Sequence, residues 1–267
     1  MKKFRICIIG AGRVGSALAK HFYSTGIQIE QIVDYDIKKA KNLAVRTNSK
    51  MFSNKLDILS EYTNIICISV QDRNIQEVVN YFLEKHIILN SVFVFHTSGS
   101  ETSEVLKPLK KLGAEVFSFH PLFSFASEKI NYDLLNTFVA VESDSRRAIN
   151  FAEIFCKEIN CKSIVIQKDK KALYHAFAVL ISNYLAILLS KAENSILNKK
   201  SKIKPEQLYK PLIESTLKNI EILGVEEGLT GPIVRGDNET IEKNISALKE
   251  YYPELADIYK SFMKLVK

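Results

Sequence analysis

The sequence predicts an α/β protein in which a mostly parallel sheet is followed by an all-α C-terminal domain. In the first part of the chain, short runs of β-branched and aromatic residues alternate with helical patterns, which is typical of crossover units on a parallel sheet. Beyond residue 167 only helical periodicity remains. The polar stretch 168–171 lies at this change, so we divide the chain into domains 1–167 and 168–267.

Each predicted strand is a short apolar run, and turn or helix signals separate it from the next. Strands are expected at 4–9, 29–34, 51–52, 65–70, 92–96, 115–119, 138–141 and 163–166. Helices are expected between them at 13–25, 37–47, 74–85, 101–112 and 144–158. In the second domain the helical patterns cover 172–196, 205–223, 238–249 and 253–266.

Composition favours an ordinary soluble globular protein. The chain has 267 residues, of which 46% are apolar and 25% charged, and this balance excludes disorder and collagen-like repeats. The formal net charge is +7, but no run of five like charges occurs, so we do not expect nucleic-acid binding. The densest basic patch, at 199–204, is interpreted as a solvated loop between helices. We expect the net positive charge to attract anionic metabolites in general rather than nucleic acid.

We expect a cytoplasmic protein without a membrane span or a metal site. The N-terminus leads straight into a predicted strand and lacks the apolar segment and cleavage site of a signal peptide. The longest apolar stretch, 176–189, is shorter than the roughly 18 to 20 residues that cross a bilayer, so it is predicted to be a buried helix. The four cysteines form no C-x-x-C pair, and buried, reduced thiols are expected.

The helix predicted at 172–196 is apolar on nearly every side. A helix of this kind must be covered all round, and a domain of about 100 residues with four helices can hardly do so alone. We therefore predict a homodimer with this helix at the interface.

A glycine-rich loop follows the first predicted strand. Gly10, Gly12 and Gly15 belong to the sequence G-A-G-R-V-G, which opens a predicted helix, and Asp34 ends the second strand 19 residues later. This is the context of a dinucleotide-binding, Rossmann-type βαβ unit, in which the helix N-terminus faces the pyrophosphate. A carboxylate at residue 34 favours NAD, although nearby lysines at 38, 39 and 41 leave NADP possible. The same loop contributes Arg13 and Val14 to the predicted cofactor site.

Polar groups end three neighbouring strands, and ligands of open α/β sheets bind beyond such ends. The predicted cofactor contacts at these ends are Ser69, Val70, Gln71 and Thr97. His120, followed by a proline, is our candidate for proton transfer, and a hydrogen-bonded loop histidine is the alternative. For His96 we favour a structural role. Ser98 is expected to face the same crevice.

Two further groups of polar residues lie in the predicted helical domain. His175, Ser182 and Asn183 share one broad face of the first helix, where they either contact substrate or form interhelical hydrogen bonds. In the segment 229–237, Thr230 and Asp237 are suited to cap helices. Arg235 could clamp a carboxylate or phosphate, and a salt bridge to Asp237 or Glu239 is the simpler alternative.

Several of these motifs together resemble a known family. They are G-A-G-R-V-G, H-T-S-G at 96–99, H-P-L at 120–122, Y-H at 174–175, S-N-Y at 182–184 and L-T-G-P-I-V-R-G-D at 229–237. The family is uncharacterised. Its members pair a Rossmann domain with a helical domain of unknown function, and they are described as NAD(P)-dependent oxidoreductases.

The family is similar in architecture to pyrroline-5-carboxylate reductase, prephenate dehydrogenase and the 6-phosphogluconate dehydrogenase group, which dimerise through the helical domain. Prephenate dehydrogenases carry a His-Pro motif, a serine and a histidine at positions that look like His120, Ser98 and His175. This sequence departs from the patterns of these relatives at two places. Asp34 and Tyr35 replace a Ser-Arg pair suited to NADP, and Val179 stands where the 6-phosphogluconate group has the lysine four residues before its asparagine.

The sequence thus predicts a dimeric oxidoreductase that exchanges a hydride between a nicotinamide cofactor and a small, anionic keto, hydroxy or imino metabolite. His120, Ser98 and His175 are the expected catalytic residues. Asn183, Thr230 and Arg235 are the expected substrate-binding residues. The alternative is a dinucleotide-binding sensor that uses the same pocket without turnover.

Overall fold

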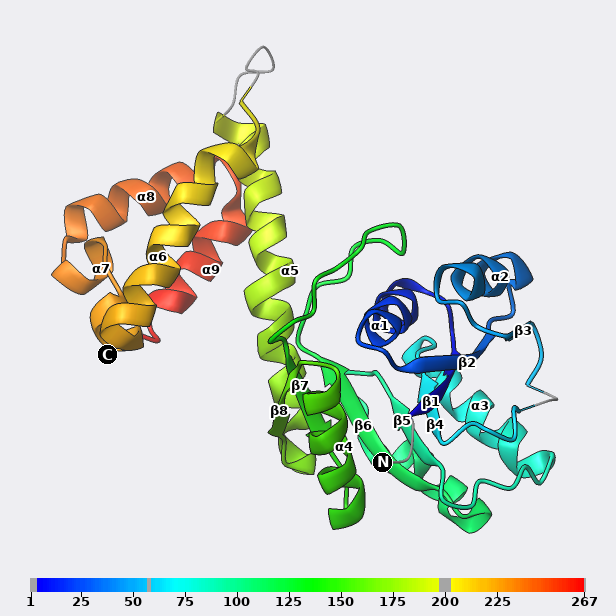
Figure 1. Cartoon of the computed structure of the whole chain (residues 1–267). Coiled ribbons are helices and arrows are strands. Elements are labelled where there is room, and N and C mark those ends of the chain that lie inside the picture. The colour runs from blue at the N-terminus through cyan, green and yellow to red at the C-terminus, as the bar shows by residue number, and fades with distance from the viewer. Residues whose placement is uncertain (1–3, 57–58, 197–202, 267) are drawn as a thin grey trace. The chain divides into compact units, whose positions relative to one another are not determined.

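A computed structural model describes residues 4–56, 59–196 and 203–266 (Figure 1). The chain divides into two compact units, 1–181 and 182–267. This division falls inside helix α5 (Lys171–Ile196), whereas the sequence places a domain boundary at residue 167. The predicted boundary stays a prediction, and each unit is described by itself.

The first unit contains one sheet of eight strands in the order β3-β2-β1-β4-β5-β6-β7-β8. All neighbours are parallel except β6 and β7. This mostly parallel sheet, followed by helices, confirms the predicted fold class. The strands are β1 (Arg5–Ile9), β2 (Gln28–Val33), β3 (Met51–Ser53), β4 (Ile65–Ile68), β5 (Phe93–His96), β6 (Glu115–Pro121), β7 (Phe138–Glu142) and β8 (Lys162–Val165).

Alternation along the central strands explains why they are apolar throughout. In β1, Ile6 and Ile8 belong to one buried cluster, while Cys7 and Ile9 belong to another. Successive side chains of a strand point to opposite faces, so a strand covered on both faces needs apolar residues at every position. The first cluster includes residues of α1 (Arg13–Ser24), α2 (Ile37–Arg46) and α4 (Arg146–Glu158). The second includes residues of α3 (Asp72–Glu84) and the 3₁₀ helix η1 (Ser103–Leu112).

Helix η1 is the one predicted helix of this unit that takes the tighter 3₁₀ form. Pro108 lies inside it and has no N–H to donate to the backbone. A short 3₁₀ turn, η2 (Lys168–Lys170), then precedes α5 and was not predicted.

All four cysteines are free, as predicted, and three of them are buried. Burial raises the pKa of Cys7 to about 12, so this thiol stays protonated. In the part of the chain that the structure describes, no three His, Cys, Asp or Glu side chains form a group suited to a metal ion.

The second unit consists of helices. They are the C-terminal part of α5, then α6 (Pro205–Gly228), α7 (Pro232–Arg235), α8 (Asn238–Tyr251) and α9 (Pro253–Met263). The predicted end of the second helix at residue 223 coincides with a break, because Gly224 has φ +84° and ψ 174°. Residues 199–202, part of the predicted basic loop, lie outside the described residues.

Helix α7 was not predicted, and its start corrects one capping assignment. Its N-cap is Gly231 and not Thr230, because Pro232 occupies the first helical turn and residue 231 has φ +105°, which favours glycine. Asp237 does cap the next helix, since its Oδ1 accepts a hydrogen bond from Thr240 N at 3.1 Å.

The expectation that the apolar stretch 176–189 is buried is wrong for the single chain. Phe177 is 55% exposed and Ile181 is 72% exposed, because no other part of the described chain covers these sides of α5. By length and composition alone, residues 168–192 would suffice to cross a membrane, with a mean hydropathy of 1.8 in the most apolar window. Core helices of soluble proteins meet the same criterion.

Candidate functional site

The glycine loop connects β1 to α1, and two of its glycines are required by close backbone contacts. Gly10 has φ +102°, and a Cβ atom there would lie 2.5 Å from Ser69 O. A Cβ atom on Gly15 would collide with the carbonyl oxygen of Gly10 and would lie 3.2 Å from Ser69 Cβ. These contacts pack the start of α1 against the ends of β1 and β4, as expected for this type of loop.

Gly12 differs from the other two, because a Cβ atom there would meet no protein atom within 4 Å. It is the N-cap of α1, with φ −74° and ψ −163°, a conformation open to any residue. No side chain caps the helix at this position, so the first backbone N–H groups of α1 are available to a ligand. The space beside Gly12 therefore fits the close approach of a pyrophosphate.

A cavity of about 840 Å³ lies beside this loop in the first unit. Such a volume is within the range of small-molecule sites. Six of the ten predicted cofactor residues line it: Gly10, Gly12, Asp34, Ser69, Val70 and Gln71. Arg13, Val14, Gly15 and Thr97 are not among its lining residues, although they belong to the same loop and strand ends. Tyr35, Lys39, Asn54 and Lys55 line the cavity beyond the end of β2.

Asp34 is held in place by backbone hydrogen bonds. Its Oδ2 accepts from Ala11 N at 2.7 Å, and its Oδ1 accepts from Asp36 N at 2.9 Å. The side chain thereby ties the glycine loop to the end of β2. Each carboxylate oxygen can accept a further hydrogen bond, so Asp34 can still bind ribose hydroxyls from the edge of the cavity.

The hydroxyl of Ser98 is already engaged in the structure. Its Oγ donates to Asp72 Oδ2 at 2.7 Å and accepts from Glu101 N at 3.0 Å. The single proton of this hydroxyl therefore points to a carboxylate. Ser98 fixes the turn after β5 in this state and has no proton left for a substrate carbonyl.

His96 has the structural role that we favoured. It is fully buried, its Nδ1 accepts from Ser98 N at 3.2 Å, and its Nε2 lies 3.1 Å from Thr102 O. Since Nδ1 is the acceptor, Nε2 carries the proton and donates to the carbonyl. Burial lowers the pKa of His96 to about 4, so the ring is neutral at physiological pH.

His120 lies in a cluster of polar side chains at the end of β6. Its Nδ1 is 2.9 Å from the Tyr174 hydroxyl, and its ring is 5.6 Å from that of His175, centroid to centroid. A Cβ atom on Gly99 would lie 2.9 Å from His120 Nε2 and would collide with His175 Nδ1. Only glycine fits between these rings.

The electrostatics of this cluster favour a neutral His120 and a neutral Tyr174. Burial, followed by the electrostatic effects of Lys171 and of the neighbouring His175, lowers the pKa of His120 to about 4. Burial raises the pKa of Tyr174 to about 12. Nδ1 of His175 is buried and has no hydrogen-bond partner among the described residues. A neutral imidazole next to a neutral phenol can accept a proton from a ligand and share it along the hydrogen bond.

Lys171 is a part of this cluster that sequence reasoning missed. Its place in the polar stretch 168–171 predicts a solvated side chain, but the residue is only 1% exposed. Its Nζ donates to Ser98 O at 3.1 Å and to Gly99 O at 3.2 Å. The available signal was a lysine at the start of an apolar helix, one turn before His175.

The predicted substrate-binding residues belong to the second unit, so their place in the site stays a prediction. Asn183 Oδ1 accepts from Ser182 Oγ at 2.9 Å. Arg235 forms no ion pair with any described residue, and Glu239 pairs with Lys243 at 2.6 Å instead. Hydrogen bonds from Thr240, followed by the charge of Arg235, lower the pKa of Asp237, so the two side chains attract each other without forming an ion pair within 4.0 Å. Thr230 is exposed.

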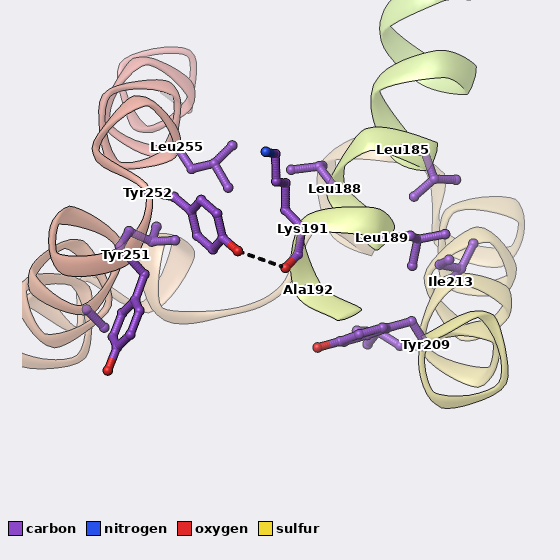
Figure 2. Close-up of a pocket in the computed structure, with 13 residues that line it drawn as sticks. Leu185, Leu188, Leu189, Lys191, Ala192, Tyr209, Ile213, Tyr251, Tyr252 and Leu255 are labelled. Atoms are coloured by element: carbon purple, nitrogen blue, oxygen red, sulfur yellow. Dashed lines mark hydrogen bonds between the residues drawn. The ribbon is translucent and has the colours of Figure 1, made fainter. Parts of the chain in front are cut away.

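A second cavity, of about 650 Å³, lies within the second unit and is mostly apolar (Figure 2). Most of its lining residues are leucines, an isoleucine, alanines and tyrosines of α5, α6, α8 and α9, and Tyr252 between α8 and α9 completes it. The Tyr252 hydroxyl donates to Lys191 O at 3.4 Å across one side. No histidine or carboxylate is among its described lining residues, and its titratable side chains are Lys191 and three tyrosines.

Two families match the chain in sequence. Residues 1–121 match a family described as a Rossmann-like domain. Residues 137–265 match a family described as a domain of unknown function, DUF2520. No curated protein matches the chain in sequence.

Solved structures with a similar fold cover nearly the whole chain. One is a Bacteroides fragilis protein described as a candidate NADP oxidoreductase, with 20% identity, 99% and 98% of the two chains covered, and a TM-score of 0.78. Another is an imine reductase from Pseudomonas sp., with 15% identity, 98% and 93% coverage, and a TM-score of 0.67. A third is prephenate dehydrogenase from A. aeolicus in complex with hydroxyphenyl propionate and NAD+, with 12% identity, 99% coverage of both chains, and a TM-score of 0.59. At these identities the likeness shows the fold.

Proposed function

We propose that this chain, which joins a Rossmann-like domain to a DUF2520 domain, is an NAD-dependent oxidoreductase. The single observation that carries the proposal is the glycine loop, where Gly12 leaves open space beside a cavity that Asp34 also lines. When bound, the dinucleotide would donate or accept a hydride. The fold shared with an imine reductase and a prephenate dehydrogenase supports the same class of reaction.

Asp34 is the reason to place NAD before NADP. Its fixed carboxylate would accept hydrogen bonds from the ribose hydroxyls and would repel a 2′-phosphate. Lys39 and Lys55 line the same cavity and could bind that phosphate, so NADP stays the second choice. Lys38 and Lys41 are not among the lining residues.

His120 is the proposed proton carrier. As a neutral base bonded to Tyr174, it would take a proton from a hydroxyl or amine substrate and return it in the reverse direction. Ser98 would act indirectly, by fixing the turn that holds Gly99 between the histidines. His175, with its unpartnered Nδ1, would orient the reacting group. Asn183, Thr230 and Arg235 would bind the anionic part of a small keto, hydroxy or imino metabolite.

We also propose that the protein is a cytoplasmic homodimer in which α5 lies at the interface. Leu173, Phe177 and Ile181 are each more than half exposed in the single chain, a cost that a second copy would remove. Light scattering at micromolar protein should give twice the 30.3 kDa of one chain. A mass of one chain under these conditions would contradict the dimer.

The proposed activity is tested by turnover. Purified protein with NADH should oxidise the cofactor in the presence of at least one member of a panel of small α-keto acids and cyclic imines that carry a carboxylate. A sensor would bind NADH and oxidise none of it with any member of the panel, and that outcome would favour the non-catalytic alternative.

A further inference from the structure

Lys171 is a buried cation that forms no ion pair with a carboxylate in the part of the chain that the structure describes. Its residue exposure is 1%, and both of its described hydrogen bonds go to the backbone carbonyls of Ser98 and Gly99. No described carboxylate lies within ion-pair distance of its ammonium group. A charge in such a place is costly to bury, and ordinary packing does not require one.

The backbone at Gly99 brings this ammonium next to the histidine pair. Gly99 O binds Lys171 Nζ at 3.2 Å. A Cβ atom on the same glycine would be 2.9 Å from His120 Nε2 and 2.8 Å from His175 Cε1. Gly99 therefore binds the ammonium group through its carbonyl oxygen and lies beside two imidazole rings that leave no room for a Cβ atom.

The other charged groups near Lys171 are bound elsewhere. Asp72, at the start of α3, accepts from Ser98 and Ser100. Glu142, at the end of β7, accepts from Ser103 N at 2.6 Å and from Ser103 Oγ at 2.9 Å. With Glu101 these carboxylates favour the charged form of the lysine from a distance.

Three more titratable side chains, on β5 and α5, share the surroundings of His120. They are His96, Tyr174 and His175. The imidazole of His96 and the phenol of Tyr174 are neutral at physiological pH. Among the groups around His120, the ammonium of Lys171 is thus a fixed positive charge near the ring.

We propose that Lys171 is a positioning residue for the reaction at His120: its ammonium group, fixed on the Ser98 and Gly99 carbonyl oxygens, keeps the His120 imidazole neutral and able to accept a proton. The proposal rests on the proposed function only in one respect, namely that His120 transfers the accepted proton during an oxidoreductase reaction. The electrostatic effect itself needs neither cofactor nor substrate.

The two groups titrate in separate pH ranges. His120 has a pKa of about 4, in which the charge of Lys171 is the second cause after burial. Burial lowers the pKa of Lys171 itself to about 8. Between these values the lysine is charged and the histidine is neutral. Above pH 8 the lysine loses its proton and the field at the histidine changes.

The test is an NMR titration of the full chain with labelled histidine, in which His120→Gln assigns the His120 signals. Lys171→Gln keeps an N–H donor for the two carbonyls and removes the charge. Lys171→Arg keeps the charge. Because the charge of Lys171 lowers the pKa of His120, its removal should raise that pKa, by about one to two pH units. At pH 5.5, His120 should be neutral in the wild type and Lys171→Arg, and partly protonated in Lys171→Gln.

Lys110→Gln, an exposed lysine on η1, serves as the control and should leave the His120 titration unchanged. An unchanged His120 titration in folded Lys171→Gln would overturn the proposal, because the lysine would then act only by holding the carbonyls. If Lys171→Gln does not fold, the His120 titration of the wild-type protein tests the proposal instead. Its His120 signals should show a second step near pH 8 that is lost in Lys171→Arg, and the absence of this step in the wild type would overturn the proposal.

These outcomes are independent of the proposed function. A failure of the titration leaves NADH binding and turnover intact. A protein that binds no dinucleotide would still show the coupling between Lys171 and His120.

Discussion

A Gly12→Ala variant is expected to fold normally and to lose affinity for NADH. The added methyl group meets no protein atom within 4 Å, and the backbone at this position suits alanine. The free energy of unfolding should therefore change by no more than about 1 kcal/mol, the usual effect at a helix N-cap. The methyl group would occupy the space beside the first N–H groups of α1, so the Kd should rise at least about tenfold.

Gly15→Ala provides the matched comparison. Its methyl group would collide with the Gly10 carbonyl, so this variant should lose about 1–3 kcal/mol of stability by overpacking. Thermal unfolding and cofactor fluorescence measure the two effects separately. Unaltered NADH affinity in Gly12→Ala would mean that the pyrophosphate does not bind at this loop.

A His120→Ala variant should retain NADH binding and lose most of its turnover. His120 does not line the cavity beside the glycine loop, so the Kd for the cofactor should stay within about twofold. Loss of a proton carrier typically lowers the rate by a factor of about 10²–10⁴. The reaction would be followed as NADH oxidation with the substrate that the panel identifies.

Two further variants separate proton transfer from general damage. His86→Asn changes an exposed histidine in a left-handed conformation that asparagine tolerates, and it should leave turnover unchanged. Tyr174→Phe removes the hydroxyl bonded to His120 Nδ1 and should give an intermediate loss. Full turnover in His120→Ala would mean that another group transfers the proton in the reaction.

The parts of the fold that depend on local patterns could be predicted from the sequence. Ile6 to Ile9 alternate between two cores, and such strands are apolar at each position because helices cover both faces. The glycine loop could also be predicted, since Gly10 and Gly15 are required by close backbone contacts between neighbouring elements. Pro108 lies in the helix that takes the 3₁₀ form, whereas the sequence pattern predicts only a helix there and not its type.

The parts that depend on tertiary contacts could not be predicted in the same way. Lys171 looks like a solvated joint residue in sequence, and only the fold places it under the turn at Ser98 and Gly99. The partner of the Ser98 hydroxyl, Asp72, lies 26 residues away. Phe177 belongs to an apolar stretch that the sequence predicts to be buried, and only the fold shows that the described chain leaves this side of α5 exposed.

The most direct test of a nicotinamide-dependent function is a titration with NADH and NADPH, followed by cofactor fluorescence. The chain contains no Trp, so protein emission interferes little with that of the bound cofactor. We predict tight binding of NADH and weak binding of NADPH, with this preference levelled or reversed in Asp34→Ser. Failure of the wild-type protein to bind either cofactor would contradict the account.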